Sequence, residues 1–299
     1  MNVLTVEKIT KSFGDFYAVK DLSFSINAGT MFGLLGPNGA GKTTTIRMIM
    51  DIIIPDTGTI SVLGNTSPKK KSNLIGYLPE ERGLYRKMKV MDLLCFLAEL
   101  KSMNRKSARK EIDSWLERME LGNWKNKKIE ELSKGMQQKV QFIGTVVHKP
   151  AVIILDEPFM GFDPINTMLI KDILLEQKKN GTTIIFSTHL MENAEKLCDE
   201  IVIINKGQAV LSGKLKDIKN NFGRKNIILE YEGDDYFLTS SPLIQKCDNY
   251  GNYVEIHLTE KANPQQLLLE AIKTATIRKF EIVEPSLNDI FIETVKKSE

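Results

Sequence analysis

A glycine-rich loop between a predicted strand and a predicted helix constrains the fold of this chain more than any other feature of the sequence. Residues 31–35 form a short apolar run that leads into the loop, and an apolar-periodic segment follows at 42–52 and ends before Pro55. The loop fits the pattern G-x-x-x-x-G-K-[ST] in the strand-to-helix context that this pattern requires. From average composition, a chance match in a chain of 299 residues has a probability of roughly 1%. The sequence therefore predicts an α/β core built around a loop that binds phosphate.

The residue types of this loop suit a nucleotide and its metal ion. Glycines allow backbone N–H groups to close around phosphate oxygens, and the start of the following helix adds a favourable dipole. We expect Lys42 to reach the β- and γ-phosphates of ATP and Thr43 to offer its hydroxyl to Mg²⁺. A second glycine pair, Gly207 with Gly213, has one residue too many between its glycines, so we expect one nucleotide loop per chain. The expected ATP-binding residues of the loop are Gly36, Pro37, Asn38, Gly39, Ala40, Gly41, Lys42, Thr43 and Thr44.

Two adjacent acids follow another apolar run. Residues 152–155 predict a buried strand that ends in Asp156-Glu157-Pro158, at the edge where open α/β sheets place their ligands. An isolated acid pair is a solvated strand end about as often as a functional site, but the phosphate loop upstream favours a metal site. We expect Asp156 to hold Mg²⁺, directly or through water, and Glu157 to orient and deprotonate the attacking water.

The pattern of apolar and polar residues outside these motifs divides the first two thirds of the chain into three parts. Residues 3–9 and 22–26 alternate apolar and polar side chains around Gly14-Asp15, which predicts antiparallel strands. The segment 90–148 is predicted to be helical, with Asp92 capping one helix and a second helix at 107–119 that buries Trp115. Apolar runs at 184–186 and 201–204 predict further strands covered on both faces, with helices between them.

The composition changes near the end of the chain. A strongly polar stretch at 220–225 precedes strand-like runs at 226–231 and 253–258 and helical patterns at 264–273 and 287–296. We expect a main domain at 1–222, with a helical subdomain at about 88–148, and a small α+β accessory domain at 223–299. The role of the accessory domain stays open between regulation, dimerisation, contact with a partner and a purely structural cap.

Charge and composition exclude several other classes of protein. A net charge of +3, from 41 basic and 38 acidic residues, gives no reason to expect a nucleic-acid partner. Cys95, Cys198 and Cys247 have no metal-ligand grouping and are expected to be packing residues in a reducing compartment. The chain starts without a signal-peptide pattern, and its apolar runs fall short of the ~18 residues that cross a bilayer. A connection to a membrane is therefore expected to come through a partner.

One further motif resembles a known family. Residues 132–138 read Leu-Ser-Lys-Gly-Met-Gln-Gln and look like the LSGGQ signature of the nucleotide-binding domain of ABC transporters, followed by a helix at 137–148. The resemblance extends over about 1–222. It implies that Ser133, Lys134, Gly135 and Met136 face the γ-phosphate of ATP on another subunit. The working unit would be a head-to-tail dimer with a second copy or a homologous ATPase subunit.

The resemblance assigns further residues. It implies that Phe13 stacks on adenine, that Asp163 lies in the loop between subunits, and that His189 contacts the γ-phosphate and joins Lys42 and Glu157 in catalysis. Glu80 stands where most members carry a metal-bridging glutamine, so the expected Mg²⁺ ligands are Thr43, Glu80 and Asp156. The chain departs from the family pattern in carrying Lys134 and Met136 in the signature and Phe162 before Asp163.

The stretch Pro79-Glu-Glu-Arg-Gly-Leu-Tyr85, the Lys-Gly-Met signature and the ending at 285–291 resemble the sodium-extrusion and drug-resistance branch of ABC exporters. The resemblance implies an ATPase that drives export of an ion, a drug or a peptide through separate transmembrane permease subunits. The chain would then be cytoplasmic and peripheral on the inner face of the cell membrane.

Two other functions remain as alternatives to the motor subunit of an exporter. A soluble ABC-type ATPase acting on ribosomes or DNA is disfavoured because the chain has one cassette and no long coiled coil. A regulatory ATP-binding module with weak turnover is suggested by Glu80 and Lys134, but the complete set of Asp156, Glu157 and His189 argues against it.

Overall fold

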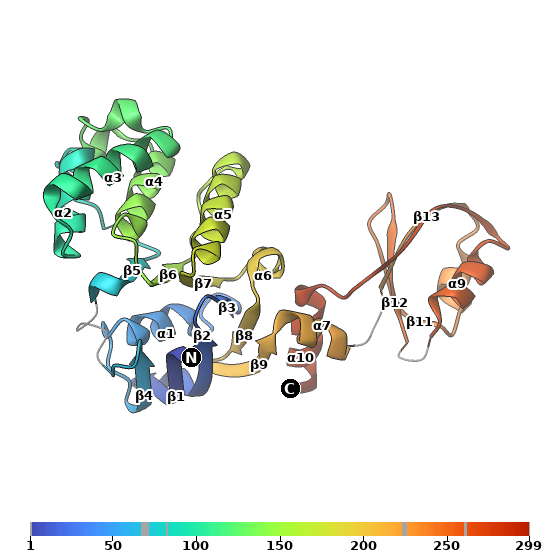
Figure 1. Ribbon diagram of the computed structural model, residues 1–299. Helices are drawn as coiled ribbons and strands as arrows, with labels where there is room; N and C mark the ends of the chain where they lie inside the picture. The colour runs from blue at the N-terminus through green and yellow to red at the C-terminus, as the bar shows by residue number, and fades with distance from the viewer. Residues whose placement is uncertain (1, 67–71, 82, 223–225, 260–261, 299) are drawn as a thin grey trace. The chain divides into compact units, whose positions relative to one another are not determined.

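A computed structural model describes residues 2–66, 72–81, 83–222, 226–259 and 262–298 of the chain (Figure 1). The chain divides into two compact units, Met1–Lys214 and Leu215–Glu299. The division lies before the boundary expected from the polar stretch at 220–225, because helix α7 (Leu215–Phe222) packs against helix α10 (Leu287–Ser298) of the second unit. The polar stretch therefore begins inside the last turn of a helix of the second unit.

The first unit is built around a mixed sheet. Within the described residues it has six strands in the order β5-β6-β7-β3-β8-β9, parallel except for the β8–β9 pair. Strands β3, β6 and β7 are buried at every position, and so are the residues 152–155, 184–186 and 201–204, which were predicted to lie in strands covered on both faces. The strands are β3 (Met31–Leu35), β5 (Ile75–Leu78), β6 (Val152–Asp156), β7 (Thr183–Thr188), β8 (Glu200–Asn205) and β9 (Gln208–Lys214).

An antiparallel sheet with strand order β2-β1-β4 belongs to the same unit. The predicted pair of strands is confirmed and is longer than the alternation suggested, since β1 spans Asn2–Phe13 and β2 spans Phe16–Asn27. Strand β4 (Thr57–Val62) pairs with the other edge of β1. The β1–β2 hairpin ends in the cross-strand pair Phe13 and Phe16, and its turn contains Gly14 with a φ of 59°.

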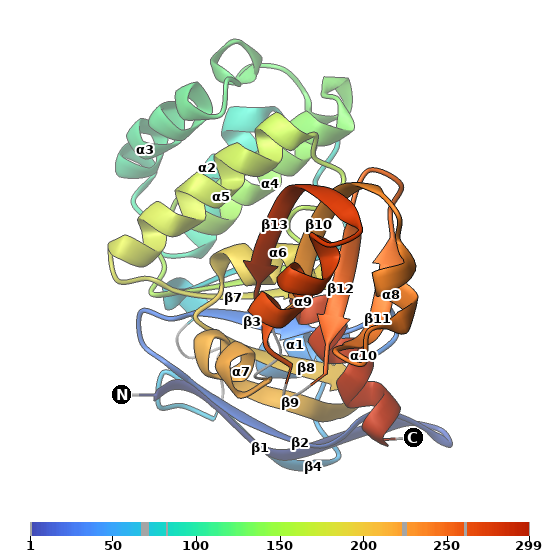
Figure 2. The same ribbon diagram turned by 90° about the vertical axis from the view of Figure 1, so that its right-hand side faces the viewer.

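Helices pack around and beside the mixed sheet (Figures 1 and 2). Helices α2, α3 and α4 gather in one block, and Trp115 of α3 is buried there, as predicted. The predicted cap at Asp92 is wrong: α2 begins at Val90 after Lys89, and Asp92 lies in its first turn. The helices of the first unit are α1 (Lys42–Ile49), α2 (Val90–Leu100), α3 (Arg105–Arg118), α4 (Lys134–Val146), α5 (Pro164–Lys179) and α6 (Met191–Leu197), with short 3-10 turns at Gly122–Trp124 and Ile129–Glu131.

The second unit has its own antiparallel sheet, with strand order β11-β12-β10-β13. The side chains of Ile227, Leu229 and Ile256 form its core together with Leu267 of α9. This agrees with the expected α+β composition. Besides α7 and α10, its elements are β10 (Asn226–Gly233), α8 (Tyr236–Ser240), β11 (Ile244–Asn249), β12 (Val254–Leu258), α9 (Pro264–Ala271) and β13 (Ala275–Val283).

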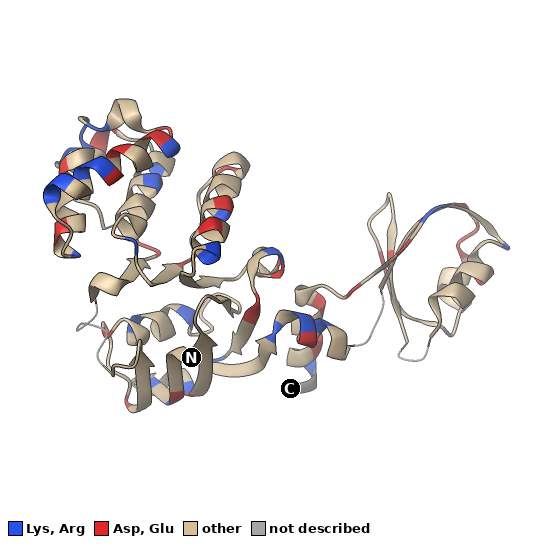
Figure 3. Ribbon diagram, viewed as in Figure 1, with Lys and Arg blue, Asp and Glu red and all other residues tan. Residues whose placement is uncertain are grey.

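The surface carries charges of both signs. Figure 3 shows basic and acidic residues close together on α3 and α5. Cys95 and Cys198 are buried and Cys247 is partly buried, and all are free thiols. In the part of the chain that the structure describes, no helix combines the length and apolar character needed to span a bilayer.

Candidate functional site

The predicted phosphate-loop, metal-binding and catalytic residues meet at the carboxyl ends of neighbouring parallel strands. Strand β7 lies between β3 and β6, so His189 after β7 is placed between the glycine loop after β3 and the acid pair at the end of β6. Strand β5 is the other neighbour of β6 and brings Glu80 to the same edge. A cavity of about 440 Å³ opens there, lined by the loop residues 38–44 and by Phe13, Glu80, Glu157 and His189.

The glycine loop depends on two close backbone contacts. Gly36 has a φ of 147°, and a Cβ there would lie 2.1 Å from the carbonyl oxygen of Ile204. Gly41 precedes α1 with a φ of 107°, and a Cβ there would lie 2.3 Å from the carbonyl oxygen of Ala18. Both positions therefore require glycine. The first turn of α1 then lines the cavity with Lys42, Thr43 and Thr44, where helix N–H groups favour an anion.

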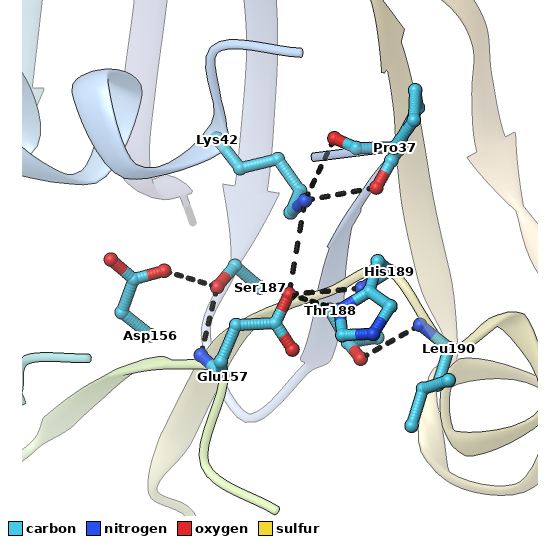
Figure 4. A network of polar contacts seen from close by, with 9 residues as sticks. Pro37, Lys42, Asp156, Glu157, Ser187, Thr188, His189 and Leu190 are labelled. Carbon is cyan, nitrogen blue, oxygen red and sulfur yellow. Dashed lines mark hydrogen bonds and ion pairs between the residues drawn. The ribbon is translucent and has the colours of Figure 1, made fainter. Parts of the chain in front are cut away.

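Lys42 is a buried residue of the cavity lining, and Figure 4 shows its polar contacts. Its Nζ donates hydrogen bonds to the carbonyl oxygens of Gly36, at 2.9 Å, and Pro37, at 3.1 Å. The same nitrogen lies 3.8 Å from Oε1 of Glu157. Burial lowers the pKa of Lys42, and the carboxylates of Glu157, Asp156 and Glu80 oppose this shift. The loop thus holds a desolvated cation beside three acids, where a phosphate would find a strong partner.

Asp156 is the most deeply buried acid of the site, with 1% of its surface exposed. Its Oδ1 accepts a hydrogen bond of 2.5 Å from the hydroxyl of Ser187, while Oδ2 has no hydrogen-bond partner among the described residues. Burial raises the pKa of this carboxyl, and the hydroxyls of Ser187 and Thr43 oppose the rise. An oxygen left without a donor in a buried site is suited to a cation.

The residues around Asp156 fit magnesium better than a metal held only by protein ligands. No cluster of three or more His, Cys, Asp or Glu side chains arranged for a metal occurs in the described ranges. Magnesium usually keeps several waters and takes one or two carboxylates together with the phosphates of its substrate. Asp156 and the hydroxyl of Thr43 supply such a partial set, and the exposed Glu80 lines the same cavity.

Glu157 links the lysine to the histidine (Figure 4). Its Oε1 accepts a hydrogen bond of 3.0 Å from the backbone N–H of His189 and lies 2.8 Å from the Nδ1 atom of the imidazole. Its own backbone N–H donates to Ser187 at 3.0 Å, and its φ is 49°. A non-glycine residue in this left-handed region is strained by roughly 1–3 kcal/mol, and such strain gathers at functional sites. The structure therefore brings together Lys42, Glu157 and His189, the residues predicted to be catalytic.

The signature residues lie elsewhere, at the start of α4. The helix begins at Lys134, earlier than the predicted 137, because Ser133 caps it by accepting a hydrogen bond of 3.3 Å from the N–H of Met136. A Cβ on Gly135 would meet no atom within 4 Å, so the surface there is open. These residues do not line the cavity of their own chain within the described residues.

Asp163, predicted to lie at a subunit interface, is the N-cap of α5. Its Oδ1 accepts a hydrogen bond of 2.9 Å from the N–H of Asn166, and this bond is the main cause of its lowered pKa. Arg82, part of the stretch that pointed to the exporter branch, lies outside the described residues.

The sequence prediction missed several residues of the site. Phe16, Ala18 and Met160 also line the cavity, and Ser187 holds the backbone of Glu157 and the carboxylate of Asp156. Phe16 follows the turn directly opposite Phe13, so an aromatic on each side of Gly14-Asp15 was the signal that could have found it. The signal for Ser187 was a hydroxyl residue at the end of an apolar strand.

Comparisons with known proteins give a consistent result. Residues 19–160 match the family model described as ABC transporter, and residues 213–295 match the one described as ATP-binding protein DrrA1-3-like, C-terminal domain. The chain is 48% identical over 293 residues to the uncharacterized ABC transporter ATP-binding protein YhaQ of Bacillus subtilis, covering 98% of each chain. It is 32% identical over 307 residues to the linearmycin resistance ATP-binding protein LnrL of the same species, covering 97% of each. A solved structure of the ATP binding subunit of an ABC transporter aligns with a TM-score of 0.70 and 31% identity, covering 74% of this chain and 93% of that one.

Proposed function

Because this chain belongs to the family of ABC transporter ATP-binding proteins, we propose that it hydrolyses ATP as the motor subunit of an exporter with separate transmembrane permease subunits. The observation that carries the proposal is the arrangement of Glu157, whose carboxylate lies between the buried Lys42 and His189 at a cavity lined by the phosphate loop. A module that only binds ATP would not need a carboxylate held in this way.

The residues that would hold the nucleotide are those of the loop 36–44, and Phe13, which lines the same cavity, would contact the base. Lys42 would release its contacts with the carbonyls of Gly36 and Pro37 to bind phosphate oxygens, which offer it full negative charge. Thr43, Asp156 and Glu80 would hold Mg²⁺, which when bound neutralises charge on the phosphates.

Hydrolysis then depends on positioning by the chain's own side chains. Glu157 is placed to orient a water molecule and to accept its proton, as a general base does. His189 shares the Glu157 carboxylate through its backbone N–H and its ring, so it fixes the direction in which the carboxylate points. Lys42 provides positive charge beside the same carboxylate, where charge stabilisation favours phosphoryl transfer.

We further propose that two chains, or this chain and a homologous subunit, close on two ATP molecules. Ser133, Lys134, Gly135 and Met136 at the N-terminus of α4 would cap the γ-phosphate bound to the partner, because a helix N-terminus with free N–H groups is an anion site. Asp163 would lie at the same interface. ATP would shift the population toward the closed dimer since it adds contacts that only the dimer offers, and hydrolysis would remove them.

The proposal of export rests on the relatives. One of them is named for resistance to linearmycin and others of similar identity are named for Nod factor export, which favours export and leaves the cargo open between an ion, a drug and a peptide. The motor would lie at the inner face of the membrane through its permease subunits. ATP binding and hydrolysis are assigned to the first unit, and Leu215–Glu299 is assigned as an accessory domain.

The test is ATP hydrolysis by the purified chain and by Glu157→Gln, with size-exclusion chromatography of both in Mg-ATP. Exposed Glu120, which follows the C-cap residue of α3, offers a matched control, Glu120→Gln. The proposal expects turnover in the parent and in the control, and an inactive Glu157→Gln that elutes as a dimer only with ATP. A parent that binds ATP and does not hydrolyse it would instead identify a regulatory module.

A further inference from the structure

Helix α4 carries a buried polar stripe that the motifs did not indicate. Its members are Gln138, Gln141 and Thr145, which follow one another at spacings of three and four residues and therefore share one face of the helix. They are 6%, 9% and 5% exposed, although amides and hydroxyls usually stay at the surface. A buried polar group is tolerated when it is hydrogen-bonded, so the partners of this α4 polar stripe indicate what it does.

The partners are the backbones of the two acid-bearing segments. The Nε2 atom of Gln138 donates to the carbonyl oxygen of Met160 at 2.7 Å and lies 3.5 Å from that of Pro158, on both sides of Phe159 in the loop that directly follows Glu157. One turn along the helix, Gln141 Nε2 donates to the carbonyl oxygen of Glu81 at 3.4 Å, directly after Glu80. The stripe thus joins one helix to both loops.

Thr145, the last member of the stripe, also lies near the segment that carries Glu80. The hydroxyl of Thr145 donates to the carbonyl oxygen of Gln141 in its own helix, at 3.0 Å, and also lies 3.3 Å from the carbonyl oxygen of Tyr77, on the strand that leads to Glu80. A cavity of about 90 Å³ lies in front of the stripe, lined by Gln138 and Gln141 and by Glu80, Asp156 and Glu157. This volume admits only a few water molecules. The glutamines therefore border the same small space as the carboxylates of the site.

The geometry of Glu157 explains why its loop needs a support of this kind. Its left-handed φ of 49° persists only if the neighbouring structure holds it. Ser187 holds the residue from its N–H side, at 3.0 Å, and Gln138 holds the two carbonyls that follow. Hydrogen bonds to carbonyls fix direction as well as distance, whereas an apolar contact would allow the loop to slide.

We propose that Gln138 and Gln141 are positioning residues that set the location of the Glu157 and Glu80 loops according to the position of α4. The start of the same helix carries the signature residues, so engagement of that end by the nucleotide of a second subunit would move the stripe and with it the carboxylate of Glu157. This consequence rests on the proposed function. The positioning itself does not, because it concerns contacts within one chain.

The test compares Gln138→Met with Lys139→Met. Methionine keeps the length of glutamine and removes its N–H donors. Lys139 is the matched control because it is also buried on α4, and its Nζ donates to the carbonyl oxygen of Met119 at 3.1 Å, within the block of α2, α3 and α4. Both variants lose a buried side-chain contact with a carbonyl, but only one of them loses a contact with an acid-bearing loop.

Hydrogen–deuterium exchange of the amides in the segment 157–161, which are those of Glu157 and of residues 159–161 because Pro158 has no amide hydrogen, is the first readout. We expect exchange there to be about tenfold faster in Gln138→Met and unchanged in Lys139→Met, with the loop 36–44 unchanged in both. Equal exchange at 157–161 in parent and Gln138→Met would overturn the proposal, whether or not the chain hydrolyses ATP. If Gln138→Met does not fold, exchange at the amides of Glu80 and Glu81 is measured in Gln141→Met with the same criterion.

The kinetic readout separates this inference from the proposed function. With an active parent, Gln138→Met should lower kcat by about 10- to 100-fold with KM for ATP within about twofold, because a small displacement of the base affects the chemical step alone. If Gln138→Met instead has the kcat of the parent and a lower Tm, the stripe stabilises the fold and does not position the catalytic loop. An inactive parent that still shows the change in exchange would contradict the proposed function and leave the positioning intact.

Discussion

Replacing Gly41 with alanine tests the account of the phosphate loop. Gly41 has a φ of 107°, a conformation that costs an L-residue roughly 1–2 kcal/mol. The new Cβ would also lie 2.3 Å from the carbonyl oxygen of Ala18, well inside contact distance. Relief requires a shift of backbone rather than of a flexible side chain, and overpacking of this kind costs about 1–3 kcal/mol.

Gly29 provides the matched control for this prediction. It also has a positive φ, of 72°, but its Cβ would meet no atom within 4 Å, so Gly29→Ala includes the conformational penalty without the collision. The collision should therefore lower the Tm of Gly41→Ala by at least about 2–4 °C more than that of Gly29→Ala, since ~1 kcal/mol corresponds to such a shift in a unit of this size.

The assay is thermal unfolding monitored by circular dichroism, together with ATP affinity measured with a fluorescent analogue. Gly41→Ala should weaken ATP binding at least tenfold, because the loop must move away from the geometry that cradles phosphate, while Gly29→Ala should bind like the parent. Equal Tm values and equal affinities for the two variants would refute the argument that close backbone approach dictates glycine at this position.

Two further predictions concern single side chains of the site. Asp156→Asn should raise the Tm of the metal-free chain near pH 7 and abolish the Mg²⁺ dependence of ATP binding. Because burial raises the pKa of this carboxyl above its unfolded value of 3.8, the higher stability of the variant should diminish as the pH falls toward 3.8. A gain in Tm that does not change with pH would contradict this explanation. Phe16→Ala should weaken ATP binding by a few-fold to about tenfold, as expected for one lost aromatic contact with the base. Tyr17 is exposed but does not line the cavity, so Tyr17→Ala should bind ATP like the parent, and an equal loss of ATP affinity in both variants would exclude a specific role for Phe16.

Much of the fold could be predicted because local signals and burial agreed. The continuous apolar runs at 31–35 and 152–155 match strands that are buried at every position. The glycine loop between a strand and a helix gave the position of the site within the sheet. Edge strands of the second unit escaped prediction because little of their surface is buried: β13 alternates irregularly between partly buried and exposed residues and carries Arg278 and Lys279.

The boundaries of helices were less predictable, since they depend on caps. Asp92 resembled a cap in the sequence, but α2 begins at Val90 and places that acid within its first turn. Ser133 was assigned to the signature, and its role as the cap of α4 was overlooked, so the predicted helix began too late. A candidate residue caps a helix only where the backbone before it is non-helical, and the sequence alone does not show where that change of backbone conformation occurs.

The site illustrates the same limit. Residue types and spacing predicted Lys42, Asp156 and Glu157, the family resemblance implied His189, and the structure brings these four together. Their supports, Ser187 and Gln138, act through hydrogen bonds between segments that lie far apart in the sequence. Ordinary polar residues of this kind carry no pattern of their own, so only the packing of α4 and β7 against the acid-bearing loops reveals them.

The most direct test of the central claim is the nucleotide content of Glu157→Gln after incubation with Mg-ATP and size-exclusion chromatography. If Glu157 is the base that ends a closed state formed by ATP, the variant should elute as a dimer that retains about one unhydrolysed ATP per chain. A monomer without nucleotide, or a dimer that contains ADP after turnover at the rate of the parent, would contradict the account.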